Sequence, residues 1–254
     1  MDGGTLVDAA LSFGGLAGVG LSGAFVYWQI GQYAAPQVPR SLFDERKVFL
    51  AYTVGLFAGI PLALFLLFFL DAFLLGAAVA AGIDLALLVI GSEVAQWAVL
   101  RSLYFGSGES GAFYALALRA GISGLLILAL VTQYFSAGTV DAAGTLEILV
   151  ASVAVLTIEI AAALLSTRGP ARRAGRTGSP WAGGLFAAVG FFLVGLGPTA
   201  GTTAGLFGSA LAALGSIWVY RRLRDPILSG LLPPPPREDA SETTEPSPYT
   251  RISR

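Results

Sequence analysis

Residues 48–100 read VFLAYTVGLFAGIPLALFLLFFLDAFLLGAAVAAGIDLALLVIGSEVAQWAVL, and this stretch decides the fold because it is almost continuously apolar. A helix rises about 1.5 Å per residue and the hydrocarbon core of a bilayer is about 30 Å thick, so one crossing needs about 20 residues. The stretch is therefore too long for a single crossing. We expect two helices, 48–70 and 73–100, with the turn around Asp71 and with Gly76 just inside the second helix.

The rest of the chain has the same apolar character. Its 254 residues are 55% hydrophobic and 12% charged, whereas soluble domains are about 45–50% apolar and about 25% charged. This composition predicts an all-α, multi-pass membrane bundle of seven transmembrane helices, with the lipid bilayer as its first partner. The helices are expected at 6–30, 48–70, 73–100, 111–134, 144–166, 181–197 and 202–220. Since the last two are short and glycine-rich, a re-entrant hairpin over 181–220 is the alternative.

The positively charged residues that flank these helices predict the orientation. Lys and Arg next to short loops stay on the cytoplasmic side of a membrane. In a seven-span arrangement, those at 40–47, 101, 168–176 and 221–224 all fall on one side, and the opposite side carries only acidic residues. This predicts an outside N-terminus and a cytoplasmic C-terminus. The Arg-rich, Lys-poor composition further suggests a prokaryotic protein of the cytoplasmic (plasma) membrane.

Residues 225–254 differ sharply from the preceding chain, since they are rich in Pro, Ser, Thr and Glu. Such a segment cannot bury enough apolar surface to fold. We therefore expect a transmembrane domain over 1–224 and a disordered cytoplasmic tail over 225–254. The four prolines at 233–236 favour an extended helix that can bind an aromatic groove of a partner, and a plain spacer is the alternative.

Four ionisable residues lie deep inside the predicted helices, namely Asp84, Glu93, Arg119 and Glu159. Glu93 is eight residues before Arg101, Arg119 is ten after Glu109, and Glu159 is nine before Arg168. At 1.5 Å per residue, each lies about 12 to 15 Å from the cytoplasmic boundary. Three charges on three consecutive helices thus share one level, which predicts a Glu93–Arg119–Glu159 cluster. Arg119 and Glu159 are the principal pair, because short-looped helices are antiparallel neighbours.

The charge count of this cluster suggests a function. Two carboxylates against one guanidinium leave one excess negative charge in a low-dielectric environment, and a proton or a monovalent cation must relieve it. We therefore predict a small ion- or proton-responsive transporter or channel-like protein. Asp84, about 180° from Glu93 around their helix, is expected to be a second station nearer the outside. The alternative for these residues is a purely structural role that fixes helix register.

Smaller polar residues and glycines complete the predicted site and its packing. A polar stripe recurs every seven residues along 144–166, and Ser123 shares a face with Arg119, four residues away. The stripe consists of Thr145, Ser152, Glu159 and Ser166. Glycine faces predict close helix packing, with a homo-oligomer or a membrane complex as their alternative use. They are Gly14 and Gly18 near the N-terminus and Gly201, Gly205 and Gly208 in the last helix. Glu147, within a turn of the outer boundary, is expected to reach the lipid headgroups.

Several classes of function are disfavoured by the sequence. Cys and His are absent, which removes the usual ligands of zinc, copper, haem and iron–sulfur clusters, so we expect no metal and no cofactor. A net charge of −1 offers no basic field for nucleic acid. No set of nucleophile, base and oxyanion donors is evident, so we expect no enzyme. The second hypothesis is a noncatalytic membrane subunit, sensor or adaptor that binds other helices and recruits a partner through its Pro-rich tail.

Overall fold

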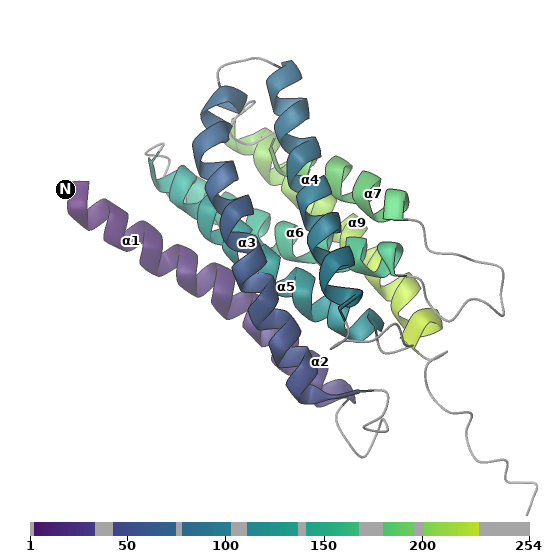
Figure 1. Cartoon of the computed structure of the whole chain (residues 1–254). Coiled ribbons are helices and arrows are strands. Elements are labelled where there is room, and N and C mark those ends of the chain that lie inside the picture. The colour runs from purple at the N-terminus through teal and green to yellow at the C-terminus, as the bar shows by residue number, and fades with distance from the viewer. Residues whose placement is uncertain are drawn as a thin grey trace, which may run out of the picture.

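The computed structural model describes residues 3–33, 43–74, 78–102, 111–136, 141–167, 180–195 and 201–228. Every regular element in these ranges is helical, and α1, a π-helical turn η1 and α2 follow one another without a break (Figure 1). The described part of the chain thus forms seven helices, each overlapping one predicted span. The elements are α1 (Gly3–Gly15), η1 (Leu16–Gly20), α2 (Leu21–Tyr33), α3 (Glu45–Leu74), α4 (Ala78–Leu100), α5 (Gly111–Ser136), α6 (Ala142–Ser166), α7 (Pro180–Val194) and α9 (Thr202–Leu228).

The lengths and composition of these helices are those of a membrane protein. Five are long and apolar enough to cross a bilayer, and two shorter apolar helices accompany them. The long ones cover Ala9–Tyr33, Glu45–Leu67, Gly111–Ser136, Ala142–Ser166 and Thr202–Arg224, and the shorter ones Leu85–Leu100 and Trp181–Val194. The chain is therefore a multi-pass helical membrane bundle.

Two helix boundaries differ from the sequence expectation. The turn predicted around Asp71 is wrong, because α3 continues through Asp71 to Leu74 and α4 begins at Ala78. Neither Gly nor Pro occurs between Leu62 and that end, and one Asp among good helix formers does not stop a helix. Gly76 lies outside the described residues. α9 continues past residue 220 to Leu228, and the tail beyond it, residues 229–254, also lies outside them.

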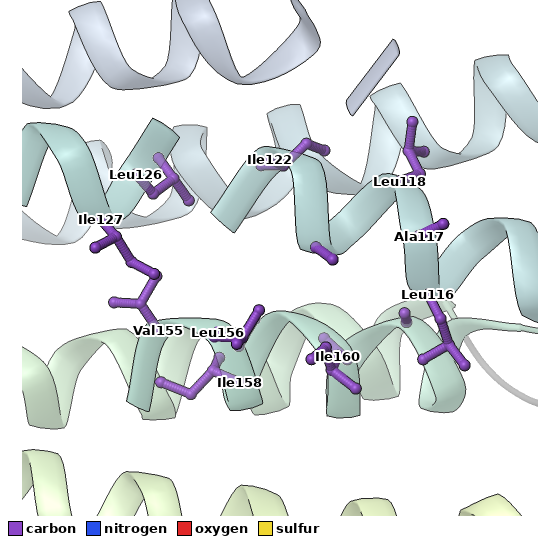
Figure 2. Packing of buried hydrophobic residues seen from close by; sticks show 14 of the residues in the cluster. Leu116, Ala117, Leu118, Ile122, Leu126, Ile127, Val155, Leu156, Ile158 and Ile160 are labelled. Atoms are coloured by element: carbon purple, nitrogen blue, oxygen red, sulfur yellow. The ribbon is translucent and has the colours of Figure 1, made fainter. Parts of the chain in front are cut away.

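The core of the bundle lies around α5 and α6. α5 packs against α1, α3 and α6, and α6 packs in turn against α7 and α9. Apolar side chains meet between the two central helices, as Ile127 of α5 and Val155 of α6 do (Figure 2). Ile122, Ile127 and Ile158 are each fully buried. The surrounding helices expose large apolar residues, such as Phe57, which is 67% exposed, and Phe207, which is 77% exposed. In a bilayer these residues face lipid, so polar groups on the inner faces of α5 and α6 are shielded from it.

Glycines allow the backbones around α5 to approach closely. Gly18 lies against α5 such that a Cβ would collide with the carbonyl oxygen of Gly124, and a Cβ on Gly14 would lie 2.8 Å from Leu128. Gly55 of α3 and Gly121 of α5 pack against each other's helix in the same way. This is the small-residue packing by which membrane helices associate. It occurs here within one chain.

The glycine face predicted for the last helix needs a correction at its first member. Gly201 lies before α9, with a positive φ of 94°, and nothing lies within 4 Å of the position its Cβ would take. It therefore adopts a left-handed conformation at the entry to the helix, where glycine is favoured, and does not pack against another helix. Gly205 and Gly208 are buried in α9.

Arg224, near the end of α9, joins the last helix to the first. Its Nε donates to the Tyr33 hydroxyl at 2.8 Å and its Nη2 to Gln32 Oε1 at 3.2 Å. The guanidinium also lies over the Trp28 ring, 5.1 Å from the centroid. The C-terminal ends of α2 and α9 therefore lie together at one end of the bundle.

Candidate functional site

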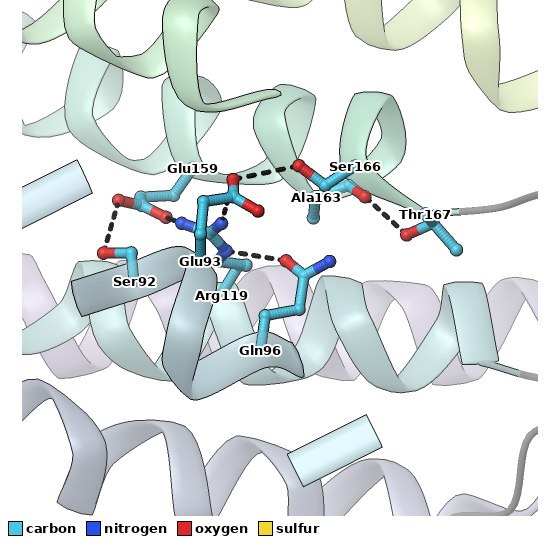
Figure 3. A network of polar contacts seen from close by, with 8 residues as sticks. All are labelled: Ser92, Glu93, Gln96, Arg119, Glu159, Ala163, Ser166 and Thr167. Carbon is cyan, nitrogen blue, oxygen red and sulfur yellow. Dashed lines mark hydrogen bonds and ion pairs between the residues drawn. The ribbon is translucent and has the colours of Figure 1, made fainter. Parts of the chain in front are cut away.

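Arg119 is the centre of a polar cluster inside the apolar bundle (Figure 3). Its side chain, on α5, is fully buried, and all three guanidinium nitrogens donate to another helix. Nε donates to Gln96 Oε1 at 2.7 Å, Nη1 to Glu159 Oε2 at 2.6 Å, and Nη2 to Glu93 Oε1 at 2.5 Å. One guanidinium thus holds α4, α5 and α6 together.

Glu159, on α6, is fully enclosed in the bundle. Its side chain has 0% exposure, and both carboxylate oxygens have a donor. Oε2 accepts from Arg119, and Oε1 accepts a longer bond from the Ser92 hydroxyl at 3.4 Å. A buried carboxylate is tolerated in this setting because it has a cationic partner and its lone pairs are occupied.

Glu93, on α4, is held differently. Its side chain is 18% exposed. Both of its contacts fall on Oε1, which accepts from Arg119 Nη2 and, at 2.9 Å, from the hydroxyl of Ser166 in the last turn of α6. The two carboxylates of the cluster therefore differ in accessibility and in the number of oxygens engaged.

The helical periodicity of α4 explains why three of its residues reach the cluster. Gln96 follows Ser92 by four residues and Glu93 by three, so all three lie on one side of the helix. That side faces α5 and α6, whereas Ile90 and Val94 on the opposite side are 56% and 57% exposed. Membrane insertion thus directs the polar side of α4 inward and its apolar side toward lipid.

The charges in the cluster do not balance. Arg119 supplies one positive charge against Glu93 and Glu159, and its remaining partners, which include Gln96, are neutral. If both carboxylates are ionised, one negative charge remains uncompensated where the dielectric is low. Among the described residues, no group of three or more acidic side chains is placed to hold a metal ion. A proton or a monovalent cation would compensate this charge.

The supporting residues predicted from sequence divide into two groups. Ser166 joins the cluster through Glu93. Ser152 and Ser123 do not, because their hydroxyls donate to carbonyls of their own helices, Ile148 at 2.7 Å and Ala120 at 2.8 Å. Thr145 likewise donates to the Asp141 carbonyl. Where water is scarce, a hydroxyl commonly satisfies itself on the preceding helical turn, so the predicted stripe is not one continuous polar surface.

Four other acidic or polar positions complete the comparison with the sequence. Asp84 belongs to α4, and the structure describes its backbone but not its side chain. Glu147 does not reach the headgroups as expected, because it is 2% exposed and accepts from the Tyr134 hydroxyl of α5 at 2.7 Å. Sequence reasoning missed Ser92 and Gln96, although their spacing around Glu93 in an otherwise apolar helix was a usable signal.

The fold and the cluster together define a multi-pass helical membrane protein with a buried arginine–carboxylate centre. Comparison of the chain with protein-family models, with curated proteins and with solved structures finds no match. The function must therefore be inferred from the site itself.

Proposed function

We propose that this chain is a small proton- or cation-responsive membrane protein of the transporter or channel-like kind, with Glu93, Arg119 and Glu159 as its responsive centre. The observation that carries the proposal is that one fully buried guanidinium is shared by two carboxylates. Uptake or release of one positive charge changes the net charge of the centre between zero and minus one. Since the centre holds α4, α5 and α6, this change alters the relative stability of their arrangements.

The proposal includes seven spans, an outside N-terminus and a cytoplasmic C-terminus in a prokaryotic plasma membrane. The Lys and Arg pattern supports this orientation. The contact of Arg224 with Tyr33 supports the odd number of spans, because that number requires the first and last helices to run in the same direction. α7 is the weakest span, since its 15 residues extend about 22 Å, less than the hydrocarbon thickness of about 30 Å.

The orientation can be tested with single cysteines, because the chain has no native cysteine. We expect Thr5→Cys to react with a membrane-impermeant maleimide on intact cells and Arg222→Cys to react only after the cells are opened. Labelling of both positions from the outside would contradict the odd span count.

The adaptor hypothesis receives less support. Gly14 and Gly18, which were candidates for binding another protein's helix, lie against Leu128 and Gly124 of the same chain. The remaining argument for an adaptor is the Pro-rich segment 231–254. Deleting that segment separates the two functions, because a transporter retains its flux and an adaptor loses its cytoplasmic partner in a pull-down. A catalytic role forms no part of the proposal.

Ion flux in proteoliposomes tests the proposed centre. The purified chain is reconstituted with a pH-sensitive dye inside the vesicles, and proton flux is followed under an imposed potential, with sodium and potassium gradients in parallel. We expect wild-type flux above that of empty vesicles and its loss in Glu93→Gln and Glu159→Gln. Ser152→Ala is the matched control, because this buried hydroxyl bonds only to its own helix. Unchanged flux in both glutamine variants would remove the centre from the mechanism.

A further inference from the structure

We infer that the proton is taken up at Glu93, on its Oε2 oxygen, and that Glu159 is the fixed counter-charge of Arg119. The use of this proton in transport rests on the proposed function, whereas its location is a separate property of the site. Two residues of the same type thus have unequal roles, and the ligand is a proton and not a metal cation.

The contacts of the two carboxylates differ in the way this assignment requires. Glu159 has no exposure, and its Oε2 and Oε1 already accept from Arg119 and Ser92. A proton on Oε2 must therefore compete with Arg119, and a proton on Oε1 requires the Ser92 hydroxyl to turn and become the acceptor. On Glu93, both donors bind Oε1, so a proton can bind Oε2 without displacing either one. Only Glu93 combines a free oxygen with partial exposure.

Helix α7 explains why Glu93 remains accessible. α7 packs against α4 and α6 and places two consecutive glycines at the site. A Cβ on Gly184 would lie 3.8 Å from Glu93 Cγ, and a Cβ on Gly183 would collide with the Ser166 hydroxyl. Gly184 therefore leaves no side chain over Glu93, and Gly183 leaves room for Ser166 to reach Glu93. A larger side chain at position 184 would cover Glu93.

The surrounding charges favour a proton over a metal cation. Arg119 from α5 and Glu159 from α6 are the charged groups in contact with the centre, and α7 carries no charged residue between Pro180 and Val194. α3, which also packs against α4, has its charged residues near its two ends, at 45–47 and 71. A metal cation needs several oxygen ligands, whereas Glu93 Oε2 offers one, beside a guanidinium. A proton needs only that one oxygen.

Covalent labelling with dicyclohexylcarbodiimide tests the assignment, because this apolar reagent reacts with protonated carboxyl groups in membranes. The full-length protein in lipid vesicles is treated over a pH series, and the modified residue is located by peptide mass spectrometry. We expect the label on Glu93, decreasing as the pH rises, and none on Glu159. Gly184→Val should suppress the label, and Gly215→Val should not, since nothing lies within 4 Å of a Cβ on Gly215.

The outcomes separate this inference from the proposed function. A label on Glu159, on neither residue, or on Glu93 without pH dependence overturns the assignment, whatever the flux experiment shows. A pH-dependent label on Glu93 in a chain that moves no ions supports the assignment and refutes transport. If Gly184→Val does not fold, the position and pH dependence of the wild-type label still decide between Glu93 and Glu159.

Discussion

Replacing Arg119 with Gln should destabilise the bundle far more than replacing Glu159 with Gln. Arg119→Gln removes three hydrogen bonds to α4 and α6. Interhelical hydrogen bonds in membranes contribute about 0.6 kcal/mol on average and up to about 1.7 kcal/mol, so three give about 2 to 5 kcal/mol. Breaking a buried ion pair costs a similar amount, about 3 to 5 kcal/mol, because the remaining charge is left without a partner. We therefore expect a loss of about 3 to 5 kcal/mol.

Glu159→Gln is the informative comparison, because it removes a charge and keeps the bonding pattern. The Gln oxygen can accept from Arg119 Nη1, and the Gln amide can donate to the Ser92 hydroxyl, which now acts as acceptor. The centre becomes neutral, since one carboxylate, Glu93, then faces one guanidinium. The loss of a charge-assisted bond is thus offset by relief of the excess negative charge, and we expect a change within about 1 kcal/mol.

The measurement is reversible unfolding in mixed micelles, in which increasing SDS denatures the protein and loss of helical circular dichroism is followed. Ser123→Ala serves as the matched control on α5, because that hydroxyl bonds only to the Ala120 carbonyl of its own helix. The charge argument is refuted if Glu159→Gln destabilises the protein as much as Arg119→Gln, since both positions would then be ordinary members of a balanced ion pair.

Two other predictions concern the packing of α3 on α5 and the buried carboxylate Glu147, which lies outside the Arg119 cluster. Gly121→Ala should cost about 1 to 3 kcal/mol, because its Cβ would collide with the Tyr52 carbonyl oxygen of α3. Gly111→Ala, with nothing within 4 Å, should be neutral in the same unfolding assay, and equal effects would contradict the close approach of α3 and α5. Tyr134→Phe should cost about 1 to 3 kcal/mol, because it leaves the buried Glu147 without its phenolic donor. Adding Glu147→Leu should recover part of that loss, and a further loss of similar size would show that the two side chains act independently.

The helices were predictable because a membrane imposes length and apolarity together. Each of the seven predicted spans overlaps a described helix, from residues 6–30, which fall within Gly3–Tyr33, to 202–220, which fall within Thr202–Leu228. The turn between the second and third helices was misplaced because Asp71 was treated as a boundary. A single acidic residue within a helix is a weak stop signal, and glycine is a stronger one. The first glycine after Asp71 is Gly76.

The charged cluster was predictable for a similar reason, since depth in a membrane can be counted along a helix. Glu93, Arg119 and Glu159 were placed at one level by the 1.5 Å rise alone, and each carboxylate is in direct contact with Arg119. The neutral members were not predictable in the same way. Ser92 and Ser152 are both buried serines, yet one bonds across helices to Glu159 and the other to its own backbone. Which bond a serine hydroxyl forms depends on the rotation of its helix and on which side chains of the neighbouring helix face it.

The way Arg119 is satisfied supports the proposed responsive centre over a device that only fixes helix register. Its Nε is satisfied by the neutral oxygen of Gln96 at 2.7 Å, so a neutral acceptor on α4 is sufficient for one donor of this guanidinium. A second glutamine at position 93 could also accept from Nη2, and the centre would then be a balanced pair of Arg119 and Glu159. A carboxylate at position 93 instead adds a charge that must be compensated at a partly exposed position of the cluster. That position for a costly charge is expected if its purpose is to gain and lose a proton.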